Sequence, residues 1–90
     1  KMLERDINII NKLGLHARAA AKLVNTASSY TAEVLIRKDG HEVNGKSIMG
    51  VMMLAASKGS QITLHAEGED EAESIDSLEA LINNRFNEEE

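Results

Sequence analysis

The chain contains no cysteine, and this absence excludes a disulfide framework, a zinc-thiolate site and a thiol nucleophile. A chain without cysteine suits a reducing compartment, so we expect a cytoplasmic protein. Aromatic residues are almost as scarce, since Tyr30 and Phe86 are the only two. Single-stranded nucleic-acid binders stack bases on aromatic rings, and this sequence offers no such platform.

Positive charge is also in deficit, because 15 acidic residues outnumber 10 Lys and Arg residues and leave a formal net charge of −5. Phosphate backbones are bound by basic surfaces, so no nucleic-acid partner is expected. No apolar run approaches the roughly 20 residues that a membrane span needs, which argues against membrane insertion. The histidines, His16, His41 and His65, lack the spacing of metal ligands, and no metal site or other cofactor is expected.

Ninety residues correspond to one small domain, 1–90, with little room for a self-contained substrate cavity. Hydrophobic periodicity predicts seven elements in the order βαββαβα. The expected strands cover 3–10, 32–38, 41–43 and 61–66, and the expected helices cover 17–28, 47–56 and 70–86.

Four strands with three helices on one face form a two-layer α+β sandwich. Asp39-Gly40 predicts a tight type I′ hairpin turn between the second and third strands, because both residues tolerate positive φ. The alternating stretch QITLHA, residues 61–66, supplies the polar side chains that an uncovered sheet face requires.

The stretch NKLGLHARAAAKLV, residues 11–24, places His16 and Arg18 where a helix should begin. The first N–H groups of a helix lack intrahelical partners and lie at the positive end of its dipole, so they form an anion site. The guanidinium of Arg18 matches phosphate oxygens. The positive helix end disfavours the imidazolium, so we expect His16 to be neutral and nucleophilic near pH 7. This combination favours a covalent phosphohistidine.

Two other interpretations of His16 remain open on spacing alone. A histidine near a helix start is most often an ordinary surface residue, and the same groups would serve a non-covalent anion sensor. The sequence has no Walker-type loop and therefore shows no nucleotide site of its own. A phosphoryl group on His16 would have to come from, and go to, other proteins.

Two segments resemble the signatures of the HPr family, the histidine-containing phosphocarriers of the bacterial phosphoenolpyruvate-dependent phosphotransferase system. GLHARAAAKLV is similar to the active-site segment of that family, and NGKSIMGVMMLAASKG, residues 44–59, is similar to the segment around its regulatory serine. The resemblance covers nearly the whole chain. It implies an open-faced βαββαβα sandwich with an antiparallel sheet in the order 1-4-2-3.

The resemblance also implies roles for individual residues. His16 matches the histidine that accepts a phosphoryl group on Nδ1 from enzyme I and passes it to sugar-permease A domains. Arg18 matches the arginine that pairs with this phosphate, and the backbone N–H groups of Ala17 and Arg18 would help to hold it. Ser47 matches the serine that HPr kinase/phosphorylase modifies. Such a chain is a protein substrate of phosphotransfer and not an enzyme.

One residue departs from the family pattern. Ala19 stands where the family has proline, whose fixed φ pre-organises the first turn of a helix. Alanine is an excellent helix former, but it leaves this turn looser. We expect the substitution to alter the rate of transfer without abolishing chemistry that resides in His16 and Arg18.

Ser47 and the apolar residues after it each allow two interpretations. Serine before an apolar run is a favoured N-cap, so its hydroxyl has a structural role whether or not it is also phosphorylated. Methionines fill core gaps, but exposed methionines adapt to several partner surfaces. We expect Val51 and Leu54 to face the sheet. The predicted docking residues are Ala21, Ile48, Met49 and Met52.

A competing function is that of a regulatory binding module. In the family, the serine-phosphorylated form is a corepressor for a catabolite-control transcription factor, and a nitrogen-related branch shares the histidine motif. The KSIMGVM context of Ser47 favours the serine-regulated type, and the presence of His16 favours transfer. We expect a monomer in either case.

Overall fold

The computed structural model describes residues 2–90. Its strands and helices follow one another in the predicted βαββαβα order, with a short 3₁₀ helix after the last α-helix. The strands are β1 (Met2–Asn8), β2 (Glu33–Lys38), β3 (His41–Asn44) and β4 (Gln61–Glu67), and the helices are α1 (Ala17–Ser28), α2 (Ile48–Met53), α3 (Glu71–Asn83) and η1 (Arg85–Asn87).

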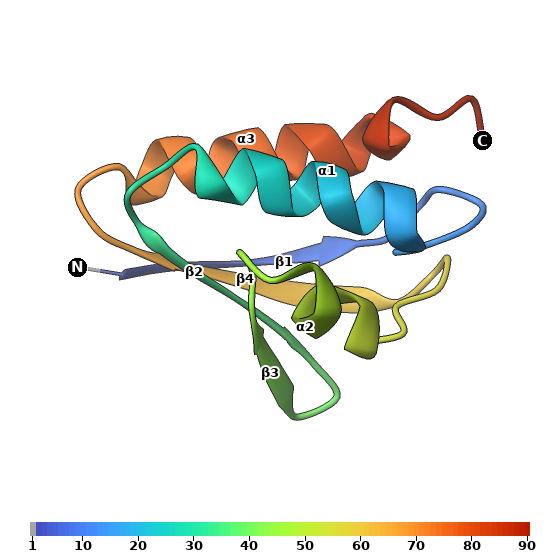
Figure 1. Cartoon of the computed structure of the whole chain (residues 1–90), viewed down its shortest axis with the longest axis horizontal. Coiled ribbons are helices and arrows are strands. Elements are labelled where there is room, and N and C mark those ends of the chain that lie inside the picture. Colours follow the sequence, from blue (N-terminus) through green and yellow to red (C-terminus); the bar gives the residue numbers. More distant parts are fainter. Residues whose placement is uncertain (1) are drawn as a thin grey trace.

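The four strands form one antiparallel sheet in the order β1-β4-β2-β3, which confirms the predicted topology. The long helices α1 and α3 lie side by side over one face of this sheet, while the short α2 packs against α1 and β3 (Figure 1). No helix within residues 2–90 is long and apolar enough to cross a membrane.

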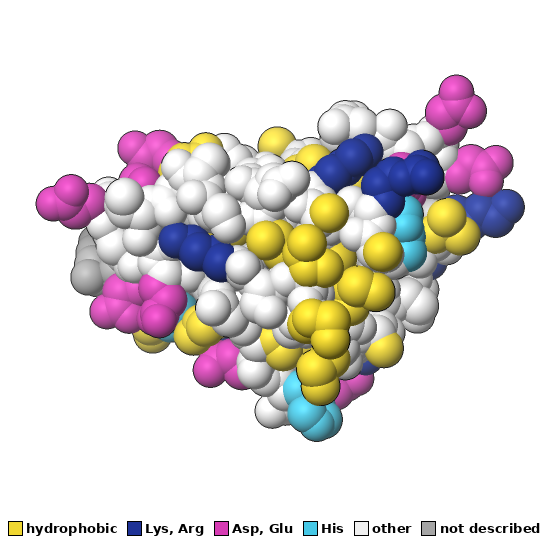
Figure 2. Space-filling model, in the orientation of Figure 1, with side chains coloured by type: hydrophobic (Ala, Val, Ile, Leu, Met, Phe, Trp, Pro, Cys, Tyr) yellow, Lys and Arg dark blue, Asp and Glu magenta, His cyan; other side chains and the backbone are white. Residues whose placement is uncertain are grey.

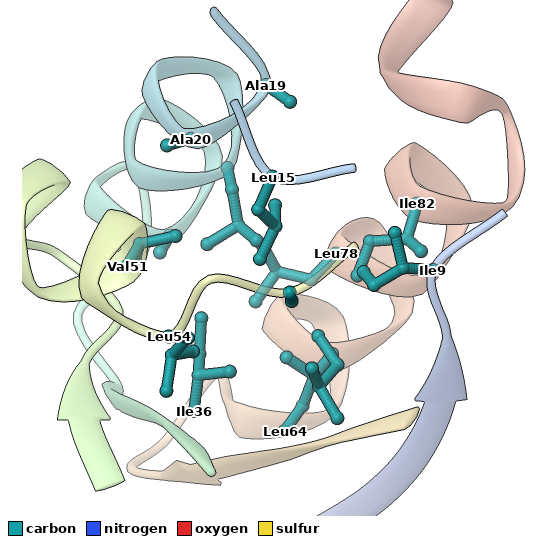
Figure 3. Close-up of a cluster of buried hydrophobic side chains, with 14 of the residues drawn as sticks. Ile9, Leu15, Ala19, Ala20, Ile36, Val51, Leu54, Leu64, Leu78 and Ile82 are labelled. Carbon is teal, nitrogen blue, oxygen red and sulfur yellow. The ribbon is translucent and has the colours of Figure 1, made fainter. Parts of the chain in front are cut away.

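The hydrophobic core lies between the helices and the sheet. Leu15, Ala19 and Ala20 enter it from the start of α1, and Val51 and Leu54 enter it from the α2 region (Figure 3). The prediction that these last two residues face inward is therefore confirmed. Because Leu15 before His16 and Ala19 and Ala20 after it are buried, the position of the histidine follows from core packing.

The other face of the sheet carries polar side chains, as the alternation in β4 predicts. Ile62, Leu64 and Ala66 are buried, whereas Thr63 and His65 point to the uncovered face. There Glu4 of β1 accepts one hydrogen bond from Arg37 of β2 at 3.1 Å and makes a second contact with Nδ1 of His65 at 3.3 Å.

The Asp39-Gly40 turn has the predicted left-handed backbone, with φ of 51° and 81°. The predicted end of α2 at residue 56 is wrong, because α2 ends at Met53 and Ala55 adopts a left-handed φ of 51°. This reversal presents the carbonyl of Ala56 to the N–H of Leu15 at 2.9 Å. Because α2 ends early, the segment after it forms a backbone hydrogen bond with the segment before α1.

The predicted end of the last helix at residue 86 is also wrong. After Asn83 the chain turns, and Arg85, Phe86 and Asn87 adopt positive φ of 57°, 55° and 65°. Left-handed backbone is unfavourable for residues other than glycine. The fully buried ring of Phe86 offsets this cost by filling the core. As a result, the C-terminal segment runs back toward the start of α1.

Candidate functional site at the start of α1

A tight loop brings His16 to the start of α1. Gly14 has a left-handed φ of 67°, and a Cβ atom there would lie 2.5 Å from the carbonyl oxygen of Ala56. Only glycine permits this approach. The Nδ2 of Asn11, a fully buried residue, donates to the carbonyl of Gly14 at 2.8 Å. The loop before His16 is therefore anchored on both sides.

His16 is the N-cap residue of α1, as predicted, with extended backbone angles of −71° and 176°. The first intrahelical bond runs from the N–H of Ala20 to the carbonyl of His16 at 2.8 Å. The N–H groups of Ala17, Arg18 and Ala19 precede this bond and form the positive end of the helix. Ala17 and Arg18 are exposed, so an anion can reach this end of α1.

A carboxylate lies against His16, and sequence analysis did not predict it. Nε2 of His16 makes a hydrogen bond with Oε2 of Glu88, a residue of the C-terminal segment. The other oxygen of Glu88 accepts a hydrogen bond from Nδ2 of Asn11 at 3.0 Å. Asn11 therefore connects the loop before His16 to the carboxylate beside the ring.

The surroundings of Glu88 keep it charged. Burial raises the pKa of its carboxyl, because the charged form loses solvation. Hydrogen bonds from Asn11 and His16 and attraction by Lys22 act in the opposite direction and prevail, so the pKa of Glu88 lies below its usual range. At neutral pH the group is a carboxylate, which accepts hydrogen bonds and donates none.

Three cationic side chains surround this end of the molecule. Lys12, Arg18 and Lys22 line one surface cavity of about 510 Å³ together with the three carboxylates of residues 88–90. Figure 2 shows Lys and Arg side chains around a histidine at this end of α1. The cavity thus carries three cationic and three anionic side chains, so its attraction for phosphate depends on the positive helix start and on Arg18 beside it.

Ser47 is the N-cap of α2, and its hydroxyl accepts a hydrogen bond from the N–H of Gly50 at 3.1 Å. The predicted capping role is confirmed. The side chain is partly exposed. Because α2 lies against α1, Ser47 and His16 belong to two neighbouring helices (Figure 1).

The predicted docking residues form an exposed apolar surface. Ile48, Met49 and Met52 are 43%, 73% and 40% exposed, and Ala21 on α1 is partly exposed. Figure 2 shows hydrophobic side chains in a band that runs over α2 toward α1 and ends near a histidine and basic residues. Isolated exposed apolar residues are ordinary on protein surfaces, whereas these residues lie together on one side of the molecule.

Sequence analysis missed several residues of this region. Leu13 and Met53 are 66% and 79% exposed, and Met53 is the last residue of α2, while Asn11 and Glu88 contact the loop and the ring of His16. The acidic C-terminal run was visible in the sequence, but nothing in it indicated a contact with a residue 72 positions away.

The three histidines lie apart and do not form a common site. His41 begins β3, and His65 lies on the uncovered sheet face beside Glu4. Across residues 2–90, no group of three or more His, Cys, Asp or Glu residues is arranged to hold a metal ion.

Comparison with known proteins agrees with this fold and motif arrangement. The family described as "PTS HPr component phosphorylation site" matches residues 3–84. The phosphocarrier protein HPr of Cupriavidus necator is 58% identical over 87 residues, which cover 97% of this chain and 98% of the relative. A crystal structure of HPr from Thermoanaerobacter tengcongensis superposes with a TM-score of 0.94 at 49% identity, covering 98% of this chain and 99% of that one.

These matches show that the chain belongs to the HPr family, the HPr components of the phosphotransferase system. The predicted family and fold are confirmed. A relative with a different name also matches: the HPr-like protein Crh of Halalkalibacterium halodurans is 49% identical over 81 residues, which cover 90% of this chain and 96% of the relative.

Proposed function

We propose that this chain is a phosphocarrier that accepts a phosphoryl group from enzyme I on Nδ1 of His16 and passes it to sugar-permease A domains in the cytoplasm. The observation that carries the proposal is the position of His16 at the N-cap of α1, beside the free N–H groups of the helix start and the basic residue Arg18. The family membership of the chain supports the same role.

The transfer step is a displacement at phosphorus between two imidazole nitrogens. The lone pair of Nδ1 of His16 forms the new P–N bond, and the P–N bond of the donor phosphohistidine breaks with its electron pair returning to the donor nitrogen. The N–H groups of Ala17 and Arg18 and the guanidinium of Arg18 bind the phosphoryl oxygens. The chain is a substrate in this exchange and needs no cofactor.

Partner docking is proposed for the exposed surface formed by Ala21, Ile48, Met49 and Met52. Because α2 packs against α1, this apolar surface would bring a partner close to the ring of His16. A Met52→Glu variant should keep its stability, since the side chain is 40% exposed, but should transfer phosphoryl groups more slowly. Met2→Glu is the matched control, because Met2 is also exposed but lies on β1. Equal transfer by the two variants would contradict this docking surface.

Ser47 is the proposed site of regulation by HPr kinase/phosphorylase. A phosphate on its hydroxyl would lie at the start of α2, where negative charge is tolerated, and beside the apolar docking surface, where it would repel acidic partners. We expect the modification to change partner choice while the fold stays intact.

The second candidate function is a regulatory binding module, either a corepressor of a catabolite-control transcription factor or a carrier of the nitrogen-related branch. The observation that favours it is the 49% identity to an HPr-like protein named Crh. Binding to such a transcription factor that requires phosphate on Ser47, without any transfer through His16, would support this alternative.

The experiment that tests the carrier role is a relay in two stages. The chain is first phosphorylated with phosphoenolpyruvate, magnesium and enzyme I, and is then separated and mixed with a permease A domain. Transfer of the phosphoryl group from a monomeric chain to the A domain is the expected result. A chain that retains the group, or that never acquires it, would contradict the proposal.

A further inference from the structure

The carboxylate of Glu88 is held rigidly beside His16. Its two oxygens have separate partners, Nε2 of His16 and Nδ2 of Asn11, and the same Asn11 nitrogen also donates to the carbonyl of Gly14. The side chains of His16 and Glu88 are only 25% and 15% exposed. A carboxylate with this degree of burial and two partners is a fixed part of the site.

The backbone on both sides of Glu88 is fixed as well. Before it, Phe86 is fully buried, and its carbonyl accepts a hydrogen bond from Nζ of Lys22 on α1 at 2.6 Å. After it, the carbonyl of Glu90 accepts a hydrogen bond from the N–H of Lys12 at 2.6 Å. The segment therefore crosses the start of α1 with attachments on either side of the carboxylate.

The contact between Glu88 and His16 determines which ring nitrogen carries the proton. An ionised carboxylate has no hydrogen to donate, so Nε2 of His16 must donate to it. In the neutral ring, Nδ1 then has no hydrogen and keeps its lone pair. The nitrogen with the lone pair is the one that the proposed transfer requires as nucleophile.

We propose that Glu88 is a positioning residue for phosphoryl transfer: it holds His16 in the tautomer with a free Nδ1 lone pair. This inference rests on the proposed function. When Nδ1 forms its bond to phosphorus and the donor P–N bond breaks, the ring keeps its hydrogen on Nε2 and becomes cationic. Glu88 balances that charge from the side opposite the incoming phosphoryl group, in the manner of the carboxylate that orients histidine in hydrolytic triads.

The matched variants for a test are Glu88→Gln and Glu89→Gln. Both remove one negative charge from neighbouring positions, but only Glu88 contacts His16. A glutamine at 88 is able to donate to Nε2 as well as to accept from it, so the fixed tautomer preference is lost. Glu89 is exposed, and its replacement controls for net charge.

The experiment combines ¹⁵N NMR of the His16 ring with phosphorylation kinetics. We expect the wild type and Glu89→Gln to show the Nε2–H tautomer, and Glu88→Gln to show a mixed population. We also expect kcat with enzyme I to fall about 10-fold for Glu88→Gln, with KM unchanged, by analogy with carboxylates that orient metal-binding histidines.

Failure of the positioning role is distinguishable from failure of the proposed function. If the wild type is phosphorylated at His16 and Glu88→Gln matches it in both tautomer and kcat, the positioning role is wrong while the proposed function stands. The same holds if Glu89→Gln is as slow as Glu88→Gln, because net charge then explains the effect. If the wild type takes up no phosphoryl group at His16, the proposed function itself fails.

Discussion

The backbone N–H of Leu15 donates a 2.9 Å hydrogen bond to the carbonyl oxygen of Ala56. This bond joins the loop that presents His16 to the segment that follows α2. The candidate site at the start of α1 and the proposed docking surface on α2 are therefore linked through a backbone hydrogen bond, and a change in one loop should alter the other.

Gly14→Ala should disrupt this connection. The new Cβ would lie 2.5 Å from the Ala56 oxygen and 2.8 Å from Cα of Ser57, at a residue with left-handed φ. We expect a loss of about 3 kcal/mol in the free energy of unfolding, measured by urea denaturation. Gly40→Ala is the control, because Gly40 also has positive φ but has open space around it, and it should lose only about 1 kcal/mol. Equal losses would show that the contact with Ala56 is unimportant.

Ala19→Pro should stabilise the protein. Ala19 precedes the first intrahelical donor, Ala20, so proline removes no helix bond and restricts the unfolded chain. We expect a gain of about 0.4–1 kcal/mol, visible as a rise in Tm. Ala20→Pro should instead lose about 3 kcal/mol, because it deletes the bond to the His16 carbonyl. A lower Tm for Ala19→Pro would contradict this account of the first turn.

Substitutions of Ser47 separate the capping role of its side chain from the effect of a negative charge at this position. Ser47→Ala removes the acceptor for the N–H of Gly50 and should cost about 1 kcal/mol of stability. Asn and Asp both restore a cap acceptor, so both variants should be nearly as stable as the wild type. Only Ser47→Asp adds negative charge beside the docking surface, and only it should slow phosphorylation by enzyme I. Equally slow transfer by Ser47→Asn would refute the role of charge.

Asp70 should contribute to stability at neutral pH but not in acid. Its carboxylate accepts hydrogen bonds from the N–H groups of Thr31 and Ala32 at 2.9 and 2.8 Å. The bond from Thr31, with smaller help from Ala32, outweighs burial and lowers the pKa of Asp70. A pKa that is lower in the folded state gives stability above the unfolded value of about 3.9, and this stability is lost as the pH falls through the folded value.

The measurement is the free energy of unfolding between pH 7 and pH 2 for the wild type and Asp70→Asn. The variant should be less stable at pH 7, and the difference should shrink toward pH 2. Asp39→Asn, in the exposed hairpin turn, should follow the wild type at every pH. A constant difference for Asp70→Asn over the whole range would show that its ionisation is irrelevant.

Much of the fold was predictable because local signals and tertiary packing agree. The apolar spacing of Ala20, Leu23, Val24 and Ala27 predicts the buried face of α1, and all four are buried. The Asp39-Gly40 pair predicts its turn for a local reason, namely tolerance of positive φ. The position of His16 at the N-cap likewise follows from the predicted start of α1 at Ala17.

The C-terminal segment was not predictable for an equally physical reason. Three consecutive residues other than glycine, Arg85–Asn87, adopt left-handed φ, and no local preference favours this. Burial of the Phe86 ring against distant residues determines the turn, and periodicity does not report such contacts. The contact between Glu88 and His16 follows from that turn, so it was missed together with it.

The central claim is that His16 carries a phosphoryl group, and the most direct measurement is intact mass after incubation with phosphoenolpyruvate, magnesium and enzyme I. The account predicts the gain of one acid-labile phosphoryl group by the wild type and by His41→Ala, and no gain by His16→Ala. The same gain in His16→Ala, or no gain in the wild type while an ATP-dependent kinase still modifies Ser47, would contradict it.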